Sequence, residues 1–160
     1  MKSGYKAPPK PKPGEFAKVR IAVIATRWNT EIVNALVTGA RRQLSAWGVS
    51  DKRVELLHAP GAYELPLACV LAAKSGRYDG IIALGVVIRG NTPHFDFVAG
   101  ECARGLQDVM LHHRIPVGFG VLTVNTVQQA QERAGPGADN KGCEAAAAVL
   151  EMIRLQRALK

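Results

Sequence analysis

Residues 80–94 read GIIALGVVIRGNTPH, and this stretch decides the fold. Its first part, 80–88, is the most apolar run of the sequence, which is typical of a strand covered on both faces. A short polar loop follows, and Pro93, with its fixed φ, favours the start of a helix that continues to about His113. The order of strand, loop and helix predicts one unit of a parallel sheet.

The same alternation continues on both sides of this unit. Apolar runs predict three further strands, and apolar residues at helical spacing predict four further helices. The strands are expected at 19–25, 53–59 and 117–124, and the helices at 30–47, 63–75, 126–134 and 140–159. Crossover helices pack back onto a parallel sheet, so we expect a three-layer α/β/α sandwich with a flavodoxin-like, four-stranded parallel sheet.

Length and charge indicate one domain with an N-terminal arm. The 160 residues, 48% of them hydrophobic, suffice for a single substantial core. The net charge is +8, but residues 1–20 carry six basic side chains and one acidic, which leaves only +3 for the rest. We expect a flexible, basic, proline-rich arm over residues 1–17 and one domain over residues 18–160, with no nucleic-acid-binding face on that domain.

The cysteines and the hydropathy pattern predict a soluble cytoplasmic protein. Cys69, Cys102 and Cys143 are far apart and have no partner at metal-ligand spacing, so we expect reduced thiols and no metal. No apolar run is long enough to span a membrane, and the N-terminus lacks the apolar segment of a signal peptide. A membrane partner is therefore not expected.

Ligands of open parallel sheets bind beyond the carboxyl ends of the strands, so the loops after the predicted strands are the candidate site. These loops are Arg27-Trp28-Asn29, Pro60 to Glu64, Arg89 to His94, and Asn125-Thr126. Polar groups, an aromatic ring and glycines thus gather at one edge of the sheet. Motifs for nucleotide triphosphates or dinucleotides do not occur.

The loop from 89 to 94 has the most distinctive chemistry. Gly90 permits close approach of backbone amides to a ligand, and Asn91 and Thr92 add short polar side chains. The amino end of the following helix favours an anion such as phosphate. His94 lies in its first turn, where it is a proton-transfer group or, alternatively, a structural residue that caps the helix.

Four other residues have both a functional and an ordinary interpretation. Trp28 can stack on a flat ring or fill packing space. Glu64 can bind hydroxyl groups or simply complement the dipole of a helix start. Arg133 and Lys141 flank a Gly-Pro-Gly break, where solvated surface charges are the ordinary interpretation.

Six stretches carry a family resemblance, and they occur in the family's order from about residue 18 onward. They are 27–29 (RWN), 60–66 (PGAYELP), 83–96 (ALGVVIRGNTPHFD), 118–123 (GFGVLT), 129–135 (QAQERAG) and 140–142 (NKG). In these motifs the chain resembles the lumazine synthase family of riboflavin biosynthesis.

The resemblance implies a transferase reaction. In the family, 5-amino-6-(D-ribitylamino)uracil condenses with 3,4-dihydroxy-2-butanone 4-phosphate to give 6,7-dimethyl-8-ribityllumazine, phosphate and water. By the same resemblance no metal or cofactor is needed. The expected assembly is a homopentamer, either alone or as part of an icosahedral shell of pentamers, with riboflavin synthase as a partner protein.

The resemblance also implies roles for individual residues. The pyrimidine and ribityl chain would contact Trp28, Asn29, Ala62, Tyr63, Glu64, Val86, Val87, Ile88 and Phe119. The phosphate ester would contact Asn91, Thr92, Arg133 and Lys141. His94 would transfer protons, and a neighbouring subunit would supply Phe119, Arg133 and Lys141 to each site.

Two positions depart from the family pattern, and two other functions remain open. Trp28 replaces the usual phenylalanine, and Asn91 stands where glutamate, alanine or aspartate often occurs, which leaves the affinity for the substrates open. One alternative is a family member that mainly binds a flavin or lumazine and catalyses weakly. The other is a polyanion-binding protein that acts through the basic arm.

Overall fold

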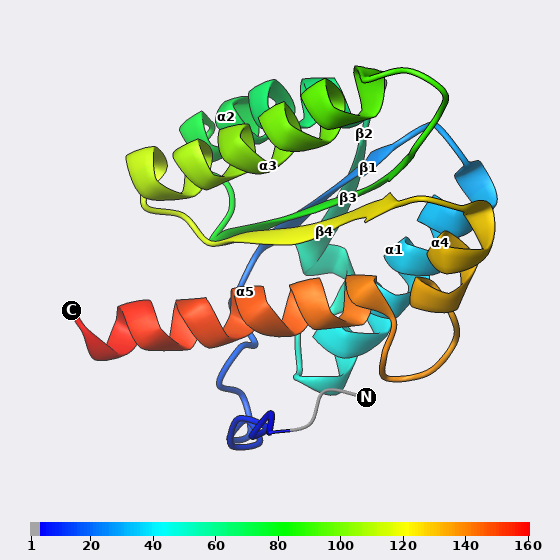
Figure 1. Cartoon of the computed structure of the whole chain (residues 1–160). Coiled ribbons are helices and arrows are strands. Elements are labelled where there is room, and N and C mark those ends of the chain that lie inside the picture. The colour runs from blue at the N-terminus through cyan, green and yellow to red at the C-terminus, as the bar shows by residue number, and fades with distance from the viewer. Residues whose placement is uncertain (1–3) are drawn as a thin grey trace.

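The computed structural model describes residues 4–160 and contains a parallel sheet between two layers of helices (Figure 1). The strand order is β2-β1-β3-β4. The strands are β1 (Ile21–Thr26), β2 (Val54–Ala59), β3 (Gly80–Ile88) and β4 (Val117–Val124). The helices are α1 (Thr30–Ala46), α2 (Leu65–Lys74), α3 (His94–His113), α4 (Val127–Arg133) and α5 (Lys141–Ala158). This arrangement confirms the expected sandwich.

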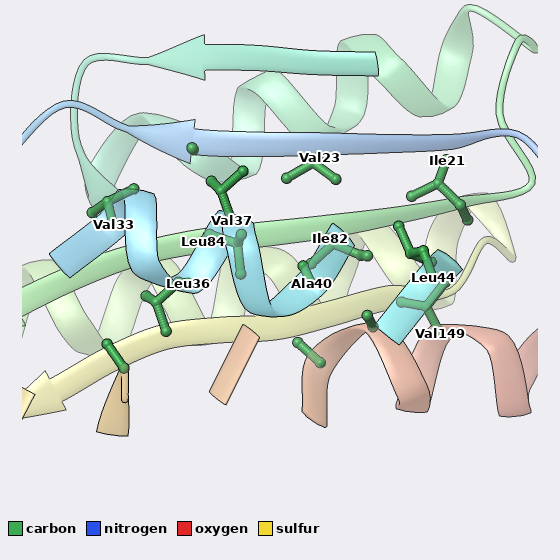
Figure 2. Close-up of a cluster of buried hydrophobic side chains, with 14 of the residues drawn as sticks. Ile21, Val23, Val33, Leu36, Val37, Ala40, Leu44, Ile82, Leu84 and Val149 are labelled. Carbon is green, nitrogen blue, oxygen red and sulfur yellow. The ribbon is translucent and has the colours of Figure 1, made fainter. Parts of the chain in front are cut away.

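The helices cover the two faces of the sheet unequally. Figure 1 shows α2 and α3 on one face, and α1, α4 and α5 on the other. On the second face, apolar side chains recur along α1 at helical spacing, among them Val33, Leu36, Ala40 and Leu44, and they are buried. Figure 2 shows these side chains against valines, isoleucines and leucines of β1 and β3. Each face of the sheet therefore has its own apolar cluster.

The strand register places all four carboxyl ends at the same edge of the sheet. Thr26 of β1 pairs with Ala59 of β2, and Ile88 of β3 pairs with Val124 of β4. We call this edge, together with the loops that follow the strands, the rim. The candidate loops found in the sequence therefore lie on one side of the molecule, as expected.

Small residues let α1 and α5 pack closely at the start of α5. Asn140 is the N-cap residue of α5, and its side chain is almost fully buried. A methyl group at Gly39 of α1 would lie 2.2 Å from Oδ1 of Asn140, and one at Gly142 would lie 2.0 Å from the carbonyl oxygen of Leu36. Because an alanine at either position would clash with these atoms, the two glycines permit the short distance between the helices.

The segment before β1 packs on the domain more closely than the sequence predicts. Phe16 is completely buried and stacks on Trp47 at a centroid distance of 5.6 Å. Arg154 of α5 pairs with Glu15 through Nε–Oε1 (2.7 Å) and Nη2–Oε2 (3.1 Å), and it also donates to the carbonyl oxygen of Pro9 (3.0 Å). Packing with the domain thus begins before residue 18, and the mobility expected for residues 1–17 stays a prediction.

Several boundaries differ from the expected ones by one or two residues, and the strand expected at 19–25 is β1, from 21 to 26. The helix expected at 63–75 begins as a 3₁₀ turn, η2 (Ala62–Glu64), and continues as α2 only from Leu65. The helix expected at 126–134 is α4, from 127 to 133, because Thr126 is its N-cap and accepts a hydrogen bond from the amide of Gln129 at 3.1 Å. Within residues 4–160, no helix is both long and apolar enough to span a membrane.

Candidate active site

The loops after β1 and β2 meet at Trp28. The Trp28 side chain is 70% exposed, which excludes the interpretation as a core residue. A methyl group at Gly61 would lie 3.3 Å from Cδ1 of Trp28 and 3.3 Å from Oε2 of Glu64. The indole and this carboxylate therefore both lie next to Gly61. Together they offer a flat apolar face beside a hydrogen-bond acceptor.

Asn29, Ala62 and Tyr63 belong to the same two loops as this pair. Asn29 has a left-handed backbone conformation (φ 55°), which asparagine adopts more readily than most residues, and its side chain does not cap α1. Ala62 is buried in η2, and Tyr63 is 61% exposed. The left-handed conformation gives Asn29 a structural reason to be present in addition to any contact with a ligand.

The loop after β3 leads into the amino end of α3. Asn91, Thr92 and His94 are all exposed, and the amide of His94 donates to Oγ1 of Thr92 at 3.4 Å. Pro93 is the N-cap residue of this 20-residue helix, and its side chain accepts no capping hydrogen bond. A methyl group at Gly90 would meet no atom within 4 Å. The loop therefore combines an exposed helix amino end with open space beside a glycine, and both favour an anionic ligand.

The last residues of β3 offer backbone groups to a ligand. Pairing of β3 with β1 ends at Leu84, whereas pairing with β4 continues to Ile88. Peptide groups of Val86–Ile88 that face the β1 side therefore lie beyond the paired part of β1. Such groups need another hydrogen-bond partner, and a planar ligand with amide-like edges can supply it.

Phe119 lies well away from the rim of its own chain. It pairs with Ala83 of β3, five residues before the end of β4 at Val124. At 3.3 Å per residue, this is about 16 Å from the carboxyl end of the strand. The side chain is nevertheless 50% exposed, on the edge strand of the sheet. A substrate at the rim of the same chain is therefore remote from Phe119.

Arg133 and Lys141 form their contacts within their own helices. Nη1 of Arg133 donates to the carbonyl oxygen of Gln129 at 3.0 Å, and Nζ of Lys141 pairs with Glu144 at 3.0 Å. Both cations lie on the side of the sheet that carries α4 and α5, whereas His94 begins α3 on the other side (Figure 1). Their contacts within the single chain therefore do not include a residue of the His94 loop.

Sequence reasoning gave no role to Arg89, although it named the loop in which Arg89 stands. In the structure its guanidinium group contacts Phe95, Asp96 and Asn125, which come from two different segments of the rim. The only signal in the sequence is a charged residue placed directly between a buried strand and a glycine. Its partners cannot be identified from such a pattern.

The described residues offer no metal centre. Within residues 4–160, no group of three or more histidine, cysteine, aspartate or glutamate side chains is arranged to hold a metal ion. The three cysteines are buried and unpaired. Burial raises the pKa of the Cys69 thiol to about 12 and that of Cys102 to about 11, so neither thiol is a nucleophile at neutral pH.

Comparison with known proteins identifies the relatives of this chain. A family model described as 6,7-dimethyl-8-ribityllumazine synthase matches residues 18–157. The 6,7-dimethyl-8-ribityllumazine synthase of Desulfovibrio desulfuricans is 52% identical over 141 residues, which are 88% of this chain and 90% of the relative. The protein of the same name from Nitratidesulfovibrio vulgaris is 53% identical over 141 residues, with the same coverage of both chains.

Proposed function

Because the chain belongs to the 6,7-dimethyl-8-ribityllumazine synthase family, we propose that the rim around Trp28, Glu64 and His94 is its active site. The chain is a transferase of riboflavin biosynthesis. It condenses 5-amino-6-(D-ribitylamino)uracil with 3,4-dihydroxy-2-butanone 4-phosphate to give 6,7-dimethyl-8-ribityllumazine, phosphate and water. The observation that carries the assignment of the site is the exposed His94 loop at the amino end of α3, on the same rim as Trp28.

The pyrimidine substrate is proposed to bind between the first three loops. The exposed indole of Trp28 stacks on its ring, and those backbone groups of Val86–Ile88 that face the β1 side bind the ring edge. Ala62, Tyr63 and Glu64 contact the ribityl chain, whose hydroxyl groups suit the carboxylate of Glu64. Asn29 supports the loop through its left-handed conformation.

The phosphate ester is proposed to bind at the start of α3. Asn91, Thr92 and the exposed helix amino end bind the phosphate. The amine of the pyrimidine then attacks the ketone and forms an imine with loss of one water. Elimination of phosphate leaves an enol that becomes a second ketone, and attack of the ribitylamino nitrogen on this ketone, with loss of a second water, closes the ring. The site acts mainly by bringing the two substrates together, while His94 transfers protons between the reacting groups.

The complete site is proposed to combine two subunits of a homopentamer. Family membership implies small-molecule substrates and an oligomeric assembly in general. Phe119, Arg133 and Lys141 act in this proposal on the neighbouring subunit's rim, which is supported by the distance of about 16 Å between Phe119 and the carboxyl end of its own strand.

Further proposals are a cytoplasmic location, riboflavin synthase as a partner, and a shell of pentamers as the alternative assembly. Light scattering separates pentamer from shell.

Steady-state kinetics of two variants test the residue roles. His94→Ala should lower kcat about 10- to 100-fold without abolishing activity, because proximity of the substrates persists. Arg133→Ala should raise KM for the butanone phosphate about tenfold, because a charge-assisted hydrogen bond is lost. An unchanged KM in the Arg133 variant refutes its role as a phosphate ligand. A single-turnover experiment with the wild type tests the alternative that the protein only stores lumazine. In that case the protein would bind added lumazine but would form none from the two substrates.

Mixing the same two variants tests whether neighbouring subunits share the site. After dissociation and joint reassembly at equal amounts, about a quarter of the interfaces would combine an intact His94 with an intact Arg133 from the next subunit. Activity of the mixture should therefore clearly exceed that of either variant reassembled alone. If His94 and Arg133 of one chain served the same site, mixing would give only the average of the two.

A further inference from the structure

Arg89 holds together parts of the rim that are distant in sequence. Its amide donates to the carbonyl oxygen of Val124 at 2.9 Å, which extends the pairing of β3 and β4 by one residue. Its Nε donates to Oδ1 of Asn125 at 3.1 Å, and its Nη2 donates to Oδ1 of Asp96 at 3.2 Å. One side chain therefore links the end of β3, the first turn of α3 and the loop after β4.

The chemistry of these contacts requires an arginine. The guanidinium carbon lies 4.2 Å from the centroid of the Phe95 ring, while two of its nitrogens donate in different directions. A planar group with several fixed donors can do both, whereas the ammonium of a lysine cannot. The Arg89 side chain is 43% exposed, so each contact taken alone is weak. Together these contacts are expected to fix the relative positions of the rim loops more than to raise the free energy of unfolding.

The contacts continue from Arg89 to α4. The amide of Asn125 donates to Oε1 of Gln129 at 2.8 Å, and the amide of Gln129 donates to Oγ1 of Thr126. The carbonyl oxygen of Gln129 in turn accepts the hydrogen bond from Arg133. A continuous series of hydrogen bonds therefore leads from the first turn of α3, which carries His94, to Arg133.

We infer that Arg89 is a positioning residue, which orients the His94 turn against the loop after β4 without contacting a substrate. The inference rests on the proposed function, since it assigns Arg89 a part in that reaction. Two observations favour positioning over direct binding of phosphate. The carboxylate of Asp96 offsets the charge of Arg89, and two of the guanidinium nitrogens already donate within the protein.

Kinetics of Arg89→Ala and Arg89→Lys test this inference against Arg104→Ala as a matched control. Arg104 is also an exposed arginine paired with acidic side chains, here Glu101 and Asp108 on α3, but it has no contact with the rim loops. Arg89→Ala should lower kcat about tenfold while KM for the pyrimidine changes less than about twofold, because the His94 turn is misplaced. Arg89→Lys should not restore kcat, and Arg104→Ala should match the wild type.

Several outcomes overturn the inference. A kcat equal to that of the wild type in Arg89→Ala does so, as does full recovery in Arg89→Lys. A change confined to KM for the butanone phosphate would make Arg89 a direct ligand. If Arg89→Ala fails to fold, Asn125→Ala removes one of the contacts while Arg89 stays in place, and an unchanged kcat there counts against the inference.

A readout without catalysis separates this inference from the proposed function. If the wild type forms no lumazine, the proposed function fails, but the imidazole signals of His94 in ¹⁵N-labelled protein still report its surroundings. These signals should shift in Arg89→Ala and stay in place in Arg104→Ala. Equal spectra for both variants would overturn the inference, whether or not the wild type is active.

Discussion

Asn140→Asp should destabilise the protein strongly, although aspartate normally caps helices as well as asparagine does. Oδ1 of Asn140 accepts hydrogen bonds from the amides of Gly142 (2.8 Å) and Cys143 (3.2 Å), as expected of an N-cap residue. Its Nδ2 donates to the carbonyl oxygens of Ala35 (3.1 Å) and Gly135 (2.9 Å). The side chain is 3% exposed, so water cannot replace a lost partner.

The expected magnitude follows from the donor side of this amide. Aspartate keeps the cap but turns a second, negatively charged oxygen toward two carbonyl oxygens, and both hydrogen bonds from Nδ2 are lost. An unsatisfied buried group costs about 1–3 kcal/mol, so the substitution should lower the free energy of unfolding by about 3–5 kcal/mol at neutral pH. Burial raises the pKa of the new carboxyl group, and its protonated form regains one donor. The deficit should therefore shrink as the pH is lowered.

Urea unfolding followed by circular dichroism measures this effect. Wild type and variants are compared at one protein concentration, because unfolding of an oligomer depends on it. Asn34→Asp is the matched control, since Asn34 is an exposed residue of α1 and the charge change is the same. That control should lie within about 0.5 kcal/mol of the wild type. If Asn140→Asp is as stable as Asn34→Asp, the two hydrogen bonds donated by Nδ2 do not contribute to stability and the reasoning is wrong.

Three further predictions concern packing, an ion pair and the thiols. Gly142→Ala should cost about 3 kcal/mol or more in urea unfolding, because the added methyl group meets the backbone of Leu36 at 2.0 Å. Glu15→Gln should cost about 1 kcal/mol at pH 7. The hydrogen bond from Arg154 holds the pKa of Glu15 below its ordinary value of 4.5, so the wild type should lose this advantage as the pH falls below about 4.5. Equal stability of the two proteins at pH 7 would contradict this. Cys69 and Cys102, with pKa values raised by burial, should react with a disulfide reagent far more slowly in the native protein than after unfolding in guanidinium chloride. These thiols ionise near pH 9 in the unfolded chain but not in the folded protein. Ionisation therefore favours the unfolded chain, and the free energy of unfolding should fall as the pH rises from about 9 to 11.

Strands of this fold could be predicted closely because their signal is local. The expected strands at 80–88 and 117–124 coincide with β3 and β4, since each is a continuous apolar run between turn residues. The burial of Phe16 is different in kind. It depends on Trp47 and on Arg154 at the other end of the chain, and a proline-rich segment carries no local sign of such partners.

The location of the candidate site could also be predicted, but the argument from strand ends does not find all of its proposed residues. Parallel topology places the loops of Trp28, Glu64 and His94 together, and the structure does so. Phe119 and Arg133 were assigned by resemblance only. The physical reason is that the rim argument finds residues after strand ends of the same chain, whereas Phe119 lies within a strand and Arg133 ends a helix beyond it.

The contacts of Arg89 connect the two sets of residues that the proposed site divides between subunits. His94 serves the rim of its own chain, and Arg133 serves the neighbour's rim in this proposal. Yet within one chain the hydrogen bonds of Arg89, Asn125 and Gln129 join the turn of His94 to Arg133. In the proposed pentamer, this series of hydrogen bonds would therefore lie between the His94 turn of one site and the guanidinium group offered to the next site. Removal of Arg89 breaks the series at its first step, so the kinetics of Arg89→Ala also report whether the two ends depend on each other.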